Sequence, residues 1–265
     1  MAKKLAEDLD AYARGIDFVI VTDRQEDFQT YANVKTYPYK QKSRVIVFDK
    51  LIALEKALEL FDSAIFIDAD SRIYDTLRQP LEFQPGLTAL SCCGLKSEML
   101  RRRKNKMARP LPAKIASLPF FSPIKIWRFL KLKYRLNDEL NKIKKKAKVL
   151  QRLSNEIDVN YQKVKYVHEI LFALTKAENK TEKSFFRFYY QISEYLQDHG
   201  FLSGQGYSMG FAAAKSGLPV TYRGNTFYPE FPYFKDRILS AKKAKGQKPD
   251  DNELKLLRFR KAVGN

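Results

Sequence analysis

The stretch AIFIDADSRIYD, residues 64–75, is a short apolar run that ends on two aspartates one residue apart. Four apolar residues bounded by polar ones predict a buried strand over residues 64–67. In open α/β sheets, ligands bind in the crevice outside the carboxyl ends of the strands. We therefore expect Asp68 and Asp70, which follow this strand, to face a ligand site.

The sequence before this strand alternates between helix-like and strand-like segments. Residues 3–14 are helix-like, and residues 18–23 predict a buried strand. Residues 49–60 have the apolar spacing of an amphipathic helix, for which Asp49 can act as the N-cap. Helix followed by buried strand, twice, is typical of an α/β domain with a largely parallel sheet. A chain of 265 residues, 45% of them hydrophobic, predicts a single domain over residues 1–265.

Two carboxylates at positions i and i+2 past a strand end can converge on one hard divalent cation. An ion held by few protein oxygens keeps sites open for substrate phosphates and can stabilise a diphosphate leaving group as a Lewis acid. The alternative is a turn in which Asp68 and Asp70 bond only to nearby backbone N–H groups. The apolar strand before the pair, and the helix before it that carries Asp49 and Lys50, favour the metal site.

The segment FDKLIALEKALELFDSAIFIDADSRIY, residues 48–74, resembles the D-x-D region of GT-A glycosyltransferases. In that family a lysine-bearing helix and a turn lead into an apolar strand that ends in the motif. Residues 17–23 (DFVIVTD) are similar to the family's second strand, and residues 185–217 resemble an acceptor-side region of bacterial members. The resemblance covers most of the chain apart from a basic segment. It implies a GT-A-like α/β fold with a mostly parallel sheet and flanking helices, a nucleotide-diphospho-sugar donor, Mn2+ or Mg2+ as cofactor, and sugar transfer.

The same resemblance implies roles for individual residues. Asp70 is expected to ligate the metal, and Asp68 to bind the metal or the donor ribose. Lys50 or Arg72 is expected near the donor phosphates, and Asp23, at the end of the preceding strand, is expected to bind the donor. GT-A domains usually open with a strand that holds the nucleotide base, whereas this sequence opens on the helix that normally follows it. We therefore expect either that an unrecognised element supplies the first strand or that the chain begins late relative to the family.

Two later segments hold candidates for the acceptor side. Residues 166–176 (YVHEILFALTK) predict a strand that contains His168 and Glu169. A glutamate near the acceptor can act as a general base, and the alternative is that Glu169 faces water. We expect the histidine to be satisfied by a local hydrogen bond rather than by a metal.

The segment GQGYSMG, residues 204–210, predicts the start of a helix rather than a dinucleotide-binding loop, because a helix and a turn precede it instead of a strand. The exposed N–H groups of such a start can receive a sugar or phosphate oxygen. Gln205 can bind a hydroxyl group there but cannot act as a general base. The alternative is a plain helix start with small packing residues.

The net charge of +19 comes mainly from residues 96–152, which hold 19 of the 49 basic residues and 3 of the 30 acidic ones. We expect a basic helical insertion at about residues 96–158. Within it an apolar stripe recurs every three or four residues up to Ile157, with Trp127 and Phe129 near its start. This pattern is typical of a helix on an anionic membrane surface and also of a helix docked on the body. The concentrated charge favours the membrane.

The sequence also bears on the compartment. No apolar run has the length of a spanning helix, the first residues lack a signal-peptide pattern, and the only two cysteines are adjacent. These features predict a cytoplasmic protein, peripheral on the inner face of the membrane if the basic helix binds lipid.

Two other functions stay open. DADSRIYDTL, residues 68–77, is similar to the motif of haloacid dehalogenase-type phosphatases, whose first aspartate is the nucleophile. Those enzymes place the motif on their opening strand and follow it with glycine. The other alternative is a non-enzymatic basic module that binds membrane or nucleic acid. A near-neutral body without a nucleic-acid-binding motif argues against nucleic acid as the partner.

Overall fold

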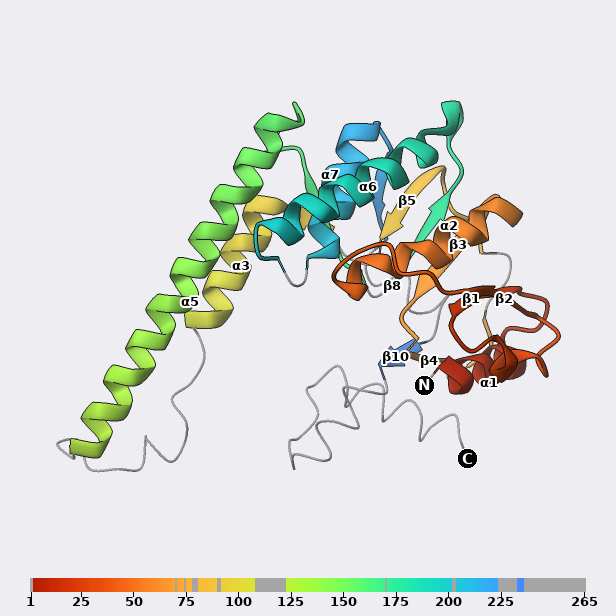
Figure 1. The fold of residues 1–265 in the computed structure, drawn as a ribbon, viewed down its shortest axis with the longest axis horizontal. Helices are drawn as coiled ribbons and strands as arrows, with labels where there is room; N and C mark the ends of the chain where they lie inside the picture. The colour runs from red at the N-terminus through yellow and green to blue at the C-terminus, as the bar shows by residue number, and fades with distance from the viewer. Residues whose placement is uncertain are drawn as a thin grey trace.

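The protein has a mixed α/β fold, described here from a computed structural model. The structure describes residues 2–69, 71–73, 75–77, 81–89, 92–107, 123–169, 171–201, 204–223 and 233–235. Figure 1 shows helices packed around short sheets, with one long helix extending away from the rest. Asp70 and residues 108–122 of the basic segment lie outside the described residues.

The central sheet has four strands in the order β3-β8-β5-β9. The strand β8 runs antiparallel to both β3 and β5, and only β5 and β9 are parallel. The expectation of a mostly parallel sheet is therefore wrong for these strands. The strands span β3 (Ser63–Ile67), β5 (Gly86–Ala89), β8 (Leu171–Thr175) and β9 (Val220–Tyr222).

The antiparallel pairing has a topological cause. The chain leaves the sheet through β5 and β6 (Cys92–Gly94) and returns through β7 (Lys165–Val167) and β8, and β6 pairs antiparallel with β7. Parallel neighbours require a crossover connection, whereas a ribbon that goes out and comes back is antiparallel. The basic segment lies between the two halves of this ribbon in the sequence.

Two smaller pairs of strands complete the described sheets. The strands β1 (Phe18–Thr22) and β2 (Val34–Pro38) are parallel, and β4 (Ser71–Ile73) is antiparallel to β10 (Tyr233–Lys235). Helix α1 (Ala2–Tyr12) is tied to β4, because Asp8 accepts hydrogen bonds from the Ile73 N–H group and from the Arg72 guanidinium. The short helix η1 (Gln25–Phe28) lies between β1 and β2 in the sequence.

The main core lies between the central sheet and its helices. Buried side chains of α2 (Leu51–Leu60), α6 (Thr181–Asp198) and α7 (Gln205–Ser216) pack against those of β5, β7 and β8. The chain reaches α6 through the short helix η3 (Glu178–Lys180). The side chains of Leu171 to Leu174 are completely buried, so β8 lies at the centre of the protein.

The start of α2 differs from the sequence-based expectation. Asp49 does not cap α2, because Asp49 lies within a 3₁₀ helix, η2 (Ile46–Lys50), that precedes α2. The buried Asp49 carboxylate accepts hydrogen bonds from the backbone N–H groups of Lys42 and Ser43 and from the Tyr39 hydroxyl. It thereby fixes the loop that follows β2.

The basic segment forms two helices, α3 (Leu95–Met107) and α5 (Pro123–Glu156), which lie side by side in Figure 1. Near the end of α5, Leu150 and Leu153 are buried in the main core, and Ile143 and Ile157 pack against it. This end of the stripe is docked on the body and is not available to a bilayer. The side chains of Trp127 and Phe129 lie outside the described ones.

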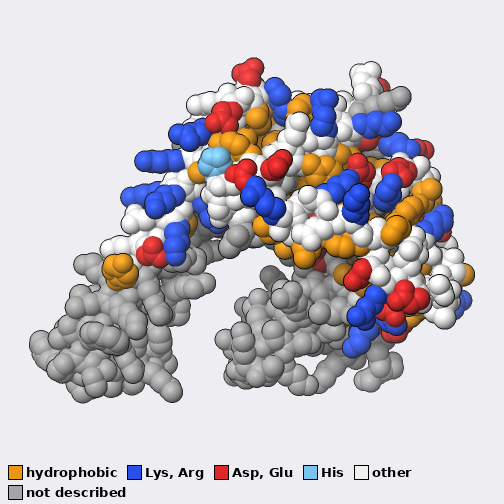
Figure 2. All heavy atoms as spheres, viewed as in Figure 1, with side chains coloured by type: hydrophobic (Ala, Val, Ile, Leu, Met, Phe, Trp, Pro, Cys, Tyr) orange, Lys and Arg blue, Asp and Glu red, His pale blue; other side chains and the backbone are white. Residues whose placement is uncertain are grey.

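The exposed face of α5 keeps its basic character. Lys144, Lys145 and Lys148 are exposed, and Figure 2 shows lysine and arginine side chains along the described part of this helix. Within the described part of the chain, every helix is too short or too polar for a transmembrane span.

Helix α7 approaches β7 closely through two glycines one turn apart. A Cβ atom on Gly206 would lie 2.2 Å from the Val167 carbonyl oxygen, and one on Gly210 would lie 1.8 Å from the Lys165 carbonyl oxygen. Both distances are shorter than atoms can approach without moving the backbone. The expected helix is confirmed, and two of the glycines in GQGYSMG are required for packing.

We predict that Gly210→Ala destabilises the protein by about 3 kcal/mol, because α7 has to move away from β7 to admit the methyl group. Urea denaturation followed by circular dichroism measures the change. Ala214→Gly is a matched control on an exposed position of the same helix and should cost only about 1 kcal/mol through helix propensity. Equal effects of the two substitutions would contradict the close packing.

Candidate functional site

A closely packed crevice, too small in this structure to hold a water molecule, lies near the end of β3, where several elements meet. Its walls come from the start of α2, from β3 and β8, from the connection before β8, and from α6 and α7. The lining residues are Lys50, Leu51, Phe66, Glu169, Phe172, Tyr189, Gln205 and Met209. Three of the polar residues selected from the sequence, Lys50, Glu169 and Gln205, therefore line one crevice.

Asp68 joins this group through an ion pair. Its Oδ1 atom accepts a hydrogen bond from the Lys50 Nζ atom at 2.6 Å, and the Asp68 side chain is only 8% exposed. A buried carboxylate needs a counter-charge because it has lost most of its hydration. The ammonium group of Lys50 supplies that charge at the crevice.

The register of the central sheet brings Asp68 and Glu169 to the same end. Ile67 pairs with Leu171 across the antiparallel β3 and β8 strands. The residue that follows Ile67 and the connection that precedes Leu171 therefore leave the sheet together. Sequence reasoning placed Asp68 at a strand end and Glu169 inside a strand, and it did not predict this adjacency, because it assumed parallel strands.

Glu169 lies outside any strand, and so does His168. The expectation of one continuous strand through both residues is wrong, because β7 ends at Val167 and β8 begins at Leu171. The Tyr166 hydroxyl donates a hydrogen bond to Glu169 Oε2 at 3.0 Å. This contact orients a half-buried carboxylate on a connecting segment, which is a more suitable place for chemistry than the middle of a sheet.

Gln205 is the first residue of α7, and its side chain is 5% exposed. Its Nε2 atom has no hydrogen-bond partner among the described residues. An amide nitrogen that is buried without an acceptor costs about 1–3 kcal/mol. This orphan donor makes the wall at Gln205 suited to an oxygen-rich ligand.

Burial raises the pKa of Tyr189, and the nearby carboxylates of Asp49 and Glu169 raise it further. Its hydroxyl donates to the Phe48 carbonyl oxygen at 3.0 Å, which fixes the 3₁₀ helix that carries Lys50. The aromatic rings of Phe66 and Phe172 stack with centroids 5.0 Å apart and form the apolar wall. Sequence reasoning missed these supporting residues, because an aromatic residue in a core segment gives no signal of its neighbours.

Other selected residues lie elsewhere. The Arg72 guanidinium, expected near the donor phosphates, binds Asp8 of α1 through two hydrogen bonds of 2.5 and 2.6 Å. Asp23 is exposed just after β1. Burial raises the pKa of Tyr39, and the carboxylates of Asp49 and Asp23 raise it further.

The residues at the crevice fit a hard cation in part. Asp68 offers carboxylate oxygens, the ligands that Mg2+ and Mn2+ prefer. Within the described ranges no group of three His, Cys, Asp or Glu residues could hold a metal ion, and Asp70, the second expected ligand, lies outside them. A D-x-D site needs only few protein oxygens when a diphosphate supplies the others.

We predict that Lys50→Met lowers the free energy of unfolding by about 2 kcal/mol, because Asp68 is left buried without its counter-charge. This value is below the range for a fully buried pair, because the Lys50 side chain is 35% exposed. Adding Asp68→Asn should restore part of the loss, which a double-mutant cycle in urea measures.

Lys56→Met on α2, the helix that begins just after Lys50, is the matched control for the lysine replacement. Lys56 pairs with Glu59 on the surface, and such pairs contribute only about 0–1 kcal/mol. If Lys50→Met were as mild as this control, the ion pair with Asp68 would have no energetic importance.

No family model matches this chain, and comparison with curated proteins and with solved structures gives no match either. The resemblance to GT-A glycosyltransferases therefore rests on the D-x-D segment and its neighbours alone. What the protein does has to be inferred from the chemistry of the crevice.

Proposed function

We propose that this protein is a metal-dependent glycosyltransferase that takes a sugar from a nucleotide-diphospho-sugar donor. One observation carries the proposal: Lys50, Glu169 and Gln205 line one crevice, and Asp68 is joined to it through its ion pair with Lys50. Phe66 and Phe172 place the crevice against β3 and β8, near the carboxyl end of β3, and α/β proteins bind their ligands at such strand ends.

The donor side of the proposed site is built from Lys50 and Asp68. A divalent ion held by Asp68 and Asp70 would stabilise the charge that develops on the leaving diphosphate. The Lys50 ammonium neutralises Asp68 in the structure described here. When the donor is bound, the three N–H donors of the Lys50 ammonium can bind phosphate oxygens as well as Asp68. Lys50 then needs to move little to contact both partners.

The acceptor side is built from Glu169 and Gln205. The Glu169 carboxylate, oriented by the Tyr166 hydroxyl, is the group that can take a proton from an acceptor hydroxyl. The Gln205 amide can donate a hydrogen bond to a sugar oxygen but cannot accept a proton at neutral pH. Apolar walls of Phe66 and Phe172 exclude water from the side of the crevice formed by the sheet.

The phosphatase alternative is less well supported. That alternative requires the nucleophile Asp68 to lie on the first strand of the domain, whereas Asp68 follows β3, the third strand in chain order. The Lys50 ammonium bound to its Oδ1 atom at 2.6 Å also reduces its reactivity toward phosphorus. Hydrolysis of p-nitrophenyl phosphate provides a direct comparison of the two functions.

The proposal predicts saturable binding of a nucleotide-sugar in the presence of Mn2+. Calorimetric titration with UDP-glucose, UDP-galactose and GDP-mannose covers the common bases. Asp68→Asn and Asp70→Asn should each weaken binding by at least about tenfold, equal to about 1.4 kcal/mol, because each removes charge from the ligand set. EDTA should have the same effect on the unmodified protein.

Asp75→Asn is the matched control, because Asp75 belongs to the same stretch but its carboxylate accepts a hydrogen bond from the Thr76 N–H group. It should leave the affinity unchanged. Failure of every nucleotide-sugar to bind with Mn2+ would contradict the proposal. Hydrolysis of p-nitrophenyl phosphate that Asp68→Asn abolishes would assign the phosphatase function instead.

A further inference from the structure

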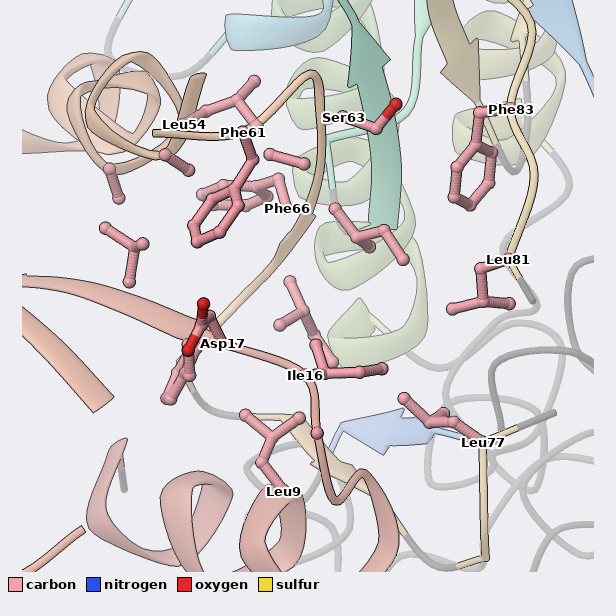
Figure 3. Close-up of a pocket in the computed structure, with 18 residues that line it drawn as sticks. Leu9, Ile16, Asp17, Leu54, Phe61, Ser63, Phe66, Leu77, Leu81 and Phe83 are labelled. Carbon is pink, nitrogen blue, oxygen red and sulfur yellow. The ribbon is translucent and has the colours of Figure 1, made fainter. Parts of the chain in front are cut away.

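A second cavity, of about 460 Å3, lies between β1 and β3 and is separate from the crevice. Figure 3 shows Leu9 and Ile16 on one side of it, Phe61 and Phe66 on the opposite side, and Leu81 and Phe83 on a third. It lies next to the smaller core cluster formed by α1, β4 and β8. Its size is that of a binding pocket rather than a packing defect.

The side chains that line this cavity offer almost no polar groups. Of the lining residues only Asp17 and Ser63 have polar side chains, and both have partners elsewhere. The Asp17 carboxylate binds the Lys35 ammonium at 2.9 Å, and the Ser63 hydroxyl is 2.8 Å from the Thr175 hydroxyl. An occupant therefore finds apolar side chains and the main chain of the two strands.

The main chain is what distinguishes this cavity from a simple apolar pocket. β1 is paired with β2 along one edge, and β3 is paired with β8 along one edge. Within the described residues, neither strand forms ladder hydrogen bonds along its other edge. Residues of both strands line the cavity, so two edges that no described strand pairs with border the same apolar space. Backbone N–H and C=O groups in such a place require partners.

We propose that the cavity is a receptor slot for one extended peptide strand with apolar side chains, which pairs with both β1 and β3. The occupant supplies main-chain donors and acceptors to both edges, as in other cases of strand addition. A hydrocarbon chain of the same volume would leave those groups unpaired. The inserted strand would join β2 and β1 to the central sheet as one continuous sheet.

The dimensions of the slot agree with this occupant. All five residues of β3 line the cavity, together with Phe18 and Val19 of β1, so a strand of about five residues can pair along β3 and reach the start of β1. Five of the lining residues on β3 and the turn before it are apolar, namely Phe61, Ala64, Ile65, Phe66 and Ile67. A strand covered on both faces is expected to be almost continuously apolar. This inference does not depend on the proposed function.

A synthetic peptide tests the proposal directly. The probe is Asp-Val-Ile-Val-Val-Ile-Asp with blocked ends and a fluorescent label, and binding to the full chain is followed by polarisation. Saturable binding is expected, with slower hydrogen exchange at the amides of β1 and β3. The same peptide N-methylated at alternate residues keeps its side chains but loses main-chain donors, and it should bind at least about tenfold more weakly.

A variant that fills the slot provides a second arm. Ala53 of α2 lines the cavity, and Ala53→Leu should weaken peptide binding at least about tenfold while leaving the melting temperature unchanged or higher, because it fills empty volume. Ala147→Leu on α5, away from the cavity, is the matched control and should bind normally. The N-methylated peptide keeps the test independent of how this variant folds.

Two results would overturn the proposal. One is the absence of saturable peptide binding to the unmodified protein. The other is equal binding of the peptide and its N-methylated form, together with binding of dodecanoate and no change in exchange at β1 and β3. The second result would identify an apolar ligand pocket in which main-chain pairing has no role.

Discussion

The strand β8 is bonded on both of its edges, and this constraint determines the arrangement around the crevice. Four successive side chains of β8 are fully buried, so its backbone groups can be paired only by other strands. Because β3 runs antiparallel to β8, the last residues of β3 and the first residues of β8 lie at the same end of the sheet. Asp68 and Glu169 are neighbours for this reason alone, although about a hundred residues separate them in the sequence.

The polar groups at this end of the sheet are costly to bury when the protein folds. The mostly buried carboxylate of Asp68 is paired with a partly exposed lysine, and the amide nitrogen of Gln205 is buried without an acceptor among the described residues. A core optimised for stability alone would replace such groups with apolar ones. Local violations of the rules that govern the rest of a fold are expected at functional sites. At this end of the sheet, polar groups that are costly to bury therefore lie beside β8, the strand that is paired along both of its edges.

Much of the local structure could be predicted from the sequence. The helices at α1, α2 and α7 and the strands β1 and β3 follow from apolar periodicity and from turn residues, and each begins and ends within a few residues of its expected place. The order of strands could not be predicted, because periodicity reports which face of a strand is buried and not which strand lies beside it. The packing role of Gly210 was left open as one of two alternatives, since a glycine required by a close backbone contact looks like any other.

The candidate site could also be predicted only in part from the sequence. Lys50, Asp68, Glu169 and Gln205 were identified by residue type and position relative to predicted elements, and the structure brings them to one crevice. Arg72 was selected on the same grounds, yet its guanidinium binds Asp8. In the sequence, an arginine four residues after a buried aspartate can equally well bind a phosphate or an acidic residue of a helix. Only the position of α1, which depends on long-range contacts, distinguishes the two.

The ring of Phe66 is shared by the crevice and by the cavity between β1 and β3. It stacks on Phe172 on the crevice side, and on the other side it borders the slot. Among the described strands β3 is paired with β8 alone, so β8 is the strand that positions the end of β3, from which Asp68 follows. Any group that fills the slot and pairs with β3 must also restrict Phe66 and the aspartate two residues beyond it. The occupancy of an apolar cavity is in this way coupled to the geometry of a polar site through a single strand.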